Sequence, residues 1–227
     1  CFAIAAAFIG LLFGIPLHAR ADSFTFEKIA DFNTVIPGGK KTFTGLHDPT
    51  INDQGQVLFR ARGKSGQRGI YVYQSGILAV VADTNTVLPS EAGALTGVHD
   101  LSMNRSGQVV FEATGSSGQQ GIYLKAGGSV AVVADRKTPI PGGSGNFTSL
   151  STPFISDQGE VLFKGDGEND QHGIYSYRGG VLAIIADTKT AIPAGKKVFV
   201  NFRHLSINRA GQVVFNGKGH SEQRGIY

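Results

Sequence analysis

The sequence has little cysteine, methionine, tryptophan or charge. It contains one Cys, one Met and no Trp, and only 17% of its 227 residues are charged. Since the single cysteine, Cys1, begins a short apolar segment, the rest of the chain offers no disulfide, no thiol nucleophile and no thiolate metal ligand. The stability of the folded chain must therefore come from packing.

Basic residues are few and scattered. The net charge is +4, and no run of Lys or Arg is longer than two residues, as at Lys40-Lys41. A nucleic-acid-binding chain usually concentrates such residues on one face, so we expect no nucleic-acid partner. The sequence also lacks a P-loop, a His-Glu-x-x-His motif, a nucleophile elbow and a dinucleotide-binding glycine motif. These absences favour a protein that is not an enzyme.

Residues 1–21 differ in composition from the rest of the chain. Phe2 to Leu17 is almost wholly apolar, and Ala19-Arg20-Ala21 then offers small residues at the positions a signal peptidase needs. This pattern is typical of a signal peptide and predicts export of residues 22–227 to the periplasm, the cell surface or the medium. An uncleaved anchor is the alternative, although the apolar run is shorter than the ~20 residues of a spanning helix. Any other membrane attachment would need an anchor outside this sequence.

The rest of the chain is a tandem repeat. Ala-Asp and Gly-Ile-Tyr each recur every 52 residues, without insertion or deletion. The Ala-Asp pairs end at Asp31, Asp83, Asp135 and Asp187, and the Gly-Ile-Tyr triplets end at Tyr71, Tyr123, Tyr175 and Tyr227. A constant period predicts that each unit packs on the next in the same way.

Each unit is predicted to contain four strands, which in the first unit cover residues 43–51, 56–61, 69–73 and 77–82. Asn52 to Gly55 predicts a type I turn whose glycine is left-handed. The fourth segment is apolar at almost every position, so both faces of the sheet should be covered. The pattern predicts an all-β fold, a β-propeller of four-stranded antiparallel blades, with a β-solenoid as the alternative.

The units are offset from the start of the mature chain. Residues 24–31 match a fourth strand only, three full repeats follow at 32–83, 84–135 and 136–187, and a partial repeat at 188–227 has only the first three strands. Because Tyr227 falls within a third strand, we expect a truncated ring with more blades. A closed four-bladed propeller completed by the strand at 24–31 is the alternative.

The turn belongs to an Asn-x-x-Gly-x-x-x-Phe motif. It occurs as Asn52, Gly55 and Phe59, and again at Asn104 and Asn208, with Ser156 replacing Asn in the third unit. The motif resembles that of tandem-repeat proteins of bacterial cell surfaces with varied carboxy-terminal anchors. This resemblance implies export and repeat architecture, and it implies no catalytic residues.

Positions that differ between the copies indicate where a ligand could bind. The repeated Asp, Gln67 and Tyr71 are expected to be structural, since they occur once per unit in the same place. In the first strand, by contrast, one pair of positions varies from unit to unit: His47-Asp48, His99-Asp100, Ser151-Thr152 and Arg203-His204. First strands of propeller blades line the central channel, so His47, Asp48, His99, Asp100, Arg203 and His204 are predicted to surround one opening.

No cofactor is expected. Asp166, Glu168 and Asp170 form an oxygen-rich hairpin that offers Ca²⁺ ligands as a minor alternative, although a downstream bidentate Glu is missing. The predicted function is a non-catalytic binding or structural module at the cell surface with a protein or carbohydrate ligand. The alternative is a propeller hydrolase or lyase that acts on polysaccharide or a lactone at the channel mouth.

Overall fold

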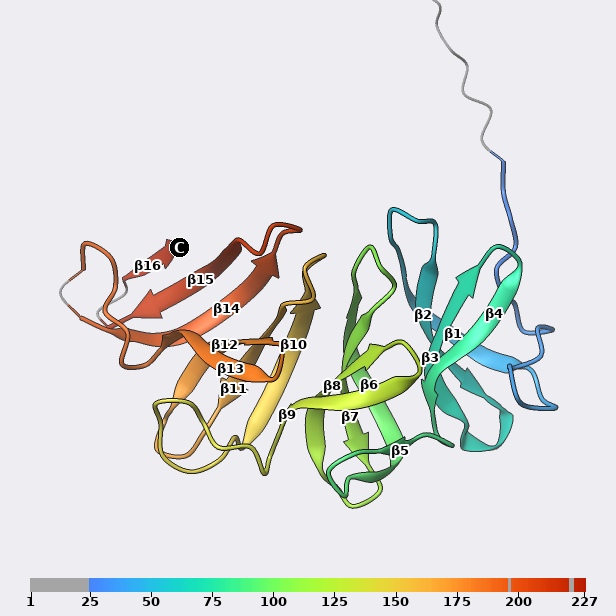
Figure 1. Cartoon of the computed structure of the whole chain (residues 1–227), viewed down its shortest axis with the longest axis horizontal. Coiled ribbons are helices and arrows are strands. Elements are labelled where there is room, and N and C mark those ends of the chain that lie inside the picture. The colour runs from blue at the N-terminus through green and yellow to red at the C-terminus, as the bar shows by residue number, and fades with distance from the viewer. Residues whose placement is uncertain (1–24, 196, 221–222) are drawn as a thin grey trace, which may run out of the picture.

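The computed structural model describes residues 25–195, 197–220 and 223–227. It shows an all-β protein with four antiparallel sheets, in which strands consecutive in the chain are neighbours. Figure 1 shows the sheets side by side in an arc, in chain order from the first sheet on the right to the fourth on the left. The predicted signal peptide at residues 1–21 lies outside the described residues.

The strands confirm the predicted four-strand unit. The first sheet contains β1 (Phe43–Ile51), β2 (Val57–Gly63), β3 (Arg68–Gln74) and β4 (Ile77–Asp83). The second contains β5 (Val87–Leu88), β6 (Gly93–Met103), β7 (Val109–Gly115), β8 (Gln120–Ala126) and β9 (Ser129–Asp135). The third contains β10 (Ser149–Ile155), β11 (Val161–Asp166), β12 (His172–Arg178) and β13 (Val181–Asp187), and the fourth contains β14 (Phe199–Ile207), β15 (Val213–Gly219) and β16 (Arg224–Ile226). The short β5 was not predicted.

Each sheet packs face to face on the next. Phe111 and Tyr123 of the second sheet share a core cluster with Leu58 and Ile70 of the first. The corresponding positions form the clusters between the second and third sheets and between the third and fourth. The four repeated phenylalanines are buried, with exposed fractions of 4% for Phe59, 0% for Phe111, 0% for Phe163 and 8% for Phe215. The continuously apolar fourth strands differ from the expectation that both faces are covered. In β4 and β13 only the last residues are buried, and Ile77 and Val181 are 70% and 67% exposed.

The repeated aspartates hold the loop that follows each unit's fourth strand, as expected. Asp83 Oδ1 accepts a hydrogen bond from Asn85 N at 2.9 Å, and Asp83 N donates to Thr86 Oγ1 at 2.9 Å. The same two bonds recur at the corresponding residues of the following units. The repeated Gly63 has a packing reason, because a Cβ there would lie 2.2 Å from Ile36 Cδ1 in the loop before the sheet.

The predicted turn also links the sheets. Gly55 has φ +74° and donates its N–H to Asn52 O at 3.0 Å, as a type I turn with a left-handed glycine requires. Asn52 Oδ1 accepts from Gln54 N and Gln56 N, both at 3.0 Å. Asn52 Nδ2 donates to Asn104 O of the next unit at 3.0 Å. The motif asparagine therefore holds its own turn and the neighbouring turn together.

Residues 25–31 differ from the prediction of a lone fourth strand at 24–31. The described residues of this segment form no strand, and Ile29 and Ala30 instead pack against the cluster of Phe59 and Tyr71. They pack on the outer face of the first sheet, at the position that β4 of the first sheet takes against the second sheet. A strand forms only with a hydrogen-bonding partner, and no sheet pairs with this segment.

Candidate functional site

The variable first-strand residues lie at a β-bulge that every unit carries. Pairing of β1 with β2 shifts between His47 and Thr50, and the corresponding shift occurs in β6, β10 and β14. Asp48 and His204 have φ values of +53° and +49°. His47, Asp48, His99 and Asp100 are exposed. Since a bulge redirects side chains out of the regular alternation, each unit presents polar groups at the same point.

The first candidate site is a crevice of about 270 Å³ between the first and second sheets. We call it the arginine crevice, and its polar side chains are His47, Arg60, Arg62, Arg68 and His99. Its other lining residues are Ala61, Gly69, Gly97 and Val98, so no acidic side chain lines it. Such a site suits an anion, because arginine binds carboxylate, sulfate and phosphate through two parallel hydrogen bonds.

The arginines of this crevice differ in how they are held. Arg60 is half-buried: its Nε donates to Asp48 Oδ2 at 2.7 Å, and its Nη1 donates to Val98 O of the second sheet at 2.9 Å. Arg62 and Arg68 are exposed and face each other across β2 and β3. Arg60 therefore has a structural partner in each sheet, while Arg62 and Arg68 are exposed and line the crevice.

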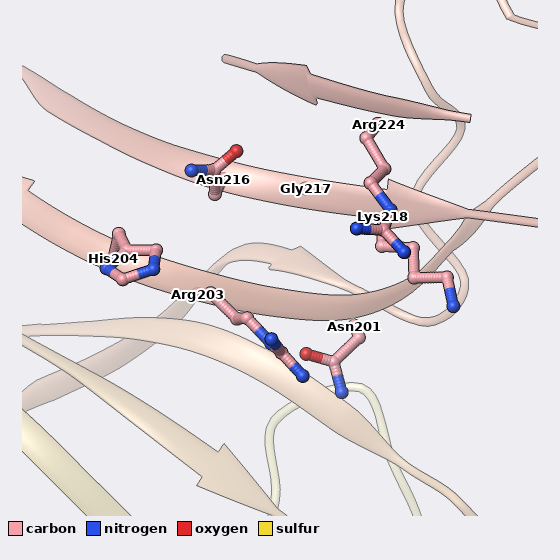
Figure 2. Close-up of a pocket in the computed structure, with 7 residues that line it drawn as sticks. All are labelled: Asn201, Arg203, His204, Asn216, Gly217, Lys218 and Arg224. Atoms are coloured by element: carbon pink, nitrogen blue, oxygen red, sulfur yellow. The ribbon is translucent and has the colours of Figure 1, made fainter. Parts of the chain in front are cut away.

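The second candidate site occupies the corresponding place on the fourth sheet. Its volume is about 220 Å³, and Asn201, Arg203, His204, Asn216, Gly217, Lys218 and Arg224 line it. Figure 2 shows the cationic side chains of Arg203, Lys218 and Arg224 on three neighbouring segments of this one sheet. We call it the fourth-sheet pocket. Arg203, Lys218 and Arg224 follow His47, Arg62 and Arg68 by three repeat periods.

At the corresponding place, the two middle sheets carry acidic side chains that are hydrogen-bonded within their own sheet. Glu112 of the second sheet is only 6% exposed and accepts a hydrogen bond from Gln120 Nε2 at 2.6 Å. Burial raises the pKa of Glu112, the Gln120 bond and nearby His99 lower it, and Asp100 raises it. In the third sheet, His172 Nδ1 lies 2.7 Å from Asp166 Oδ1. In both middle sheets these side chains pair with each other within the sheet. Among the described residues, the cationic sites are therefore those of the first and fourth units.

The six residues predicted as one ligand site lie in more than one place. His47 and His99 line the arginine crevice together, and Asp48 holds Arg60 beside it. Arg203 and His204 line the fourth-sheet pocket. Asp100 lies near the buried Glu112, whose pKa it raises. A single opening surrounded by all six stays a prediction.

The turns after the first strands meet at one small cavity. Its volume is about 160 Å³, and three residues from each of the four units line it. The second residue of each turn alternates in charge along the chain, as Asp53, Arg105, Asp157 and Arg209. Arg209 forms an ion pair with Asp53, and its Nε lies 3.6 Å from Asp157 Oδ2. The first and last units therefore touch at this end of the molecule.

Two features of the described part of the chain concern metal-ligand clusters and membrane-spanning helices. Asp166 of the oxygen-rich hairpin is hydrogen-bonded to His172, and no three His, Cys, Asp or Glu side chains gather as a metal site requires. Among the same described residues, none of the helical segments has the length and apolar character to cross a membrane.

Sequence reasoning overlooked Arg62, Arg68, Glu112 and the alternating turn charges. The signal was present, since positions 60, 62 and 68 diverge between the copies as much as the first-strand pair does. Arg60, for example, becomes Glu112, Lys164 and Asn216 in the later units. The same criterion applied to all strands would have found the arginine crevice.

One family model matches the chain twice, over residues 13–118 and 112–227. The chain belongs to the family of unknown function DUF7453. Each match covers about two of the 52-residue units, so membership in DUF7453 agrees with a tandem repeat. A search of curated proteins finds no match. The description of this family names no activity, so the function of the chain is argued from its crevices.

Proposed function

We propose that the chain is an exported β-propeller that acts as a non-catalytic binding module at the cell surface, with an anionic polysaccharide as its ligand. The observation that carries this proposal is the arginine crevice, where the exposed Arg62 and Arg68 meet two histidines, and where the charge of Arg60 is paired with Asp48. Export and surface location rest on the composition of residues 1–21 and on the resemblance of the repeat motif. An exported module meets acidic polysaccharides, which carry carboxylate or sulfate groups at regular intervals.

Three features support the propeller arrangement. Each sheet is a meander of consecutive strands, and each packs face to face on the next. The four turns after the first strands also meet around one cavity, as they would around a propeller axis. The blade number and the pairing partner of residues 24–31 belong to this proposal.

Replacing Arg62 and Arg68 together with glutamine should weaken binding of polygalacturonate at least about tenfold. A hydrogen bond to a charged group contributes about 1.5–3 kcal/mol, and about 1.4 kcal/mol corresponds to tenfold in affinity. Both side chains are exposed, so the substitutions should leave the fold intact. Isothermal titration calorimetry at fixed ionic strength measures the effect.

The matched control is Arg178→Gln, an exposed arginine at the end of β12, outside both candidate sites. It removes one positive charge without touching the crevice and should bind as the wild type does. Neutral dextran serves as the control ligand. Equal binding of dextran and polygalacturonate, or full binding by the Arg62/Arg68 double variant, would refute the proposed ligand.

A polysaccharide hydrolase or lyase is the second candidate function. The observation that favours it is Glu112, a buried carboxyl with a raised pKa near His99 and Asp100. A carboxyl that keeps its proton above its ordinary pKa is suited to general acid catalysis. The same carboxyl hydrogen-bonds Gln120, which also donates to Leu150 O of the third sheet at 3.3 Å. The bonding therefore also fits a structural contact between two sheets.

Glu112→Gln discriminates between the two candidates. Because the raised pKa means that the folded state favours the neutral acid, Glu112 contributes stability at acid pH that is lost as the pH rises through that pKa. The glutamine variant should therefore unfold at higher urea concentration than the wild type at pH 7, and its stability should fall less as the pH rises. Activity separates the candidates: a binding module should release no sugar from polygalacturonate with either protein. Wild-type release of reducing ends or unsaturated sugars from polygalacturonate, abolished in Glu112→Gln, would instead establish catalysis.

A further inference from the structure

The fourth-sheet pocket is a second copy of the arginine crevice. Arg203, Lys218 and Arg224 occupy the positions of His47, Arg62 and Arg68, three periods later in the repeat. Both sets of side chains come from the same three strands of their units. Since the strand register is the same in the first and fourth sheets, the two sites present their cations in the same order along the sheet.

The units between them lack this charge. The positions of Arg62 and Arg68 are occupied by Thr114 and Gln120 in the second sheet, and by Asp166 and His172 in the third. Asp166 and His172 bond to each other at 2.7 Å. Two cationic sites are therefore separated by two units without a comparable cluster.

The contact between the turns limits the distance between the two sites. Arg209 of the fourth unit pairs with Asp53 of the first. From Asp53 to Arg60, and from Arg209 to Asn216, the chain runs seven residues through the end of a turn and into β2 or β15, which spans at most about 23 Å at ~3.3 Å per residue. With the Arg209 and Asp53 side chains between the two segments, the sites consequently lie within about 60 Å of each other.

We infer that the arginine crevice and the fourth-sheet pocket bind one polyanionic chain together. This inference rests on the proposed function and adds that the ligand is an extended polymer held at two points. Once the first site is occupied, the second site meets the same polymer at a high effective concentration. The polymer should therefore bind far more tightly than a short oligomer of the same sugar.

The test compares a galacturonate trimer with long polygalacturonate by calorimetry. Four proteins are used: the wild type, Arg62→Gln/Arg68→Gln, Arg203→Gln/Lys218→Gln, and Arg178→Gln as the control. Wild type and control should bind two trimers per protein, and each double variant should bind one. Long polygalacturonate should bind the wild type about 10²-fold tighter or more than the trimer does, and either double variant should lose this gain.

The outcomes separate the two proposals. If Arg203→Gln/Lys218→Gln changes neither the trimer stoichiometry nor the polymer affinity while Arg62→Gln/Arg68→Gln weakens both, the two-point inference is wrong and the proposed function stands. Two trimer sites without a gain from polymer length also overturn the two-point inference. If the wild type binds neither probe, both proposals are wrong. Circular dichroism and urea unfolding of each variant establish that the fold is intact.

Discussion

Replacing Phe111 with alanine should lower the free energy of unfolding by about 3–5 kcal/mol. The Phe111 ring is fully buried between the first and second sheets, in one cluster with Leu58 and Ile70, and it stacks on Tyr123 with ring centroids 5.8 Å apart. Alanine would leave a cavity at the centre of this contact, and close packing on both sides prevents the sheets from filling it. Urea unfolding monitored by circular dichroism measures the loss.

Phe26→Ala is the matched control for this experiment. Phe26 is 97% exposed and belongs to no core cluster of the described residues. Its replacement should change the unfolding free energy by less than about 0.5 kcal/mol. If Phe111→Ala were as stable as Phe26→Ala, the face-to-face packing of the first two sheets would be wrong.

Replacing Asn104 with alanine should cost about 2–3 kcal/mol, because it breaks bonds within its own turn and between two sheets. Asn104 is 3% exposed; its Nδ2 donates to Gln108 Oε1 at 2.7 Å and to Ser156 O of the next unit at 3.0 Å. Its Oδ1 accepts from Gln108 N at 3.0 Å. Water cannot easily replace these partners at a buried site, so the unpaired groups carry their full desolvation penalty.

The chain provides its own control in Asn208. This exposed asparagine makes the same bonds within its turn, from Gln212 N at 2.9 Å and to Gln212 Oε1 at 2.7 Å. Solvent can satisfy these groups, so Asn208→Ala should cost about 0.5–1 kcal/mol. The difference between the two variants, measured by urea unfolding, isolates burial and the bond to the next sheet. Equal losses would show that the motif asparagine acts only within its own turn.

The strands and turns were predictable because their causes are local. A left-handed glycine at position 55 and an asparagine at position 52 define the same turn in any packing environment, and the structure places both as expected. The constant period also predicts the same strand register in each unit, and the first and fourth sheets share their register. The all-β meander therefore follows from the sequence without knowledge of the tertiary arrangement.

The binding surfaces depend on contacts between units, which a strand pattern does not contain. Arg62 lies in the same crevice as His99 only because the second sheet packs on the first. Glu112 is at a position that is arginine in the first unit, and its burial arises from the neighbouring third sheet. Residues 25–31 have the composition of a fourth strand, but pairing requires a partner that local sequence does not specify.

The most direct test of the central claim is a crystal structure of the protein with galacturonate trimer. The account predicts density for the sugar in the arginine crevice, with carboxylate oxygens within hydrogen-bond distance of the Arg62 and Arg68 guanidinium groups, and a second trimer in the fourth-sheet pocket. Trimer bound at the cavity between the four turns, or at any surface without these arginines, would contradict it.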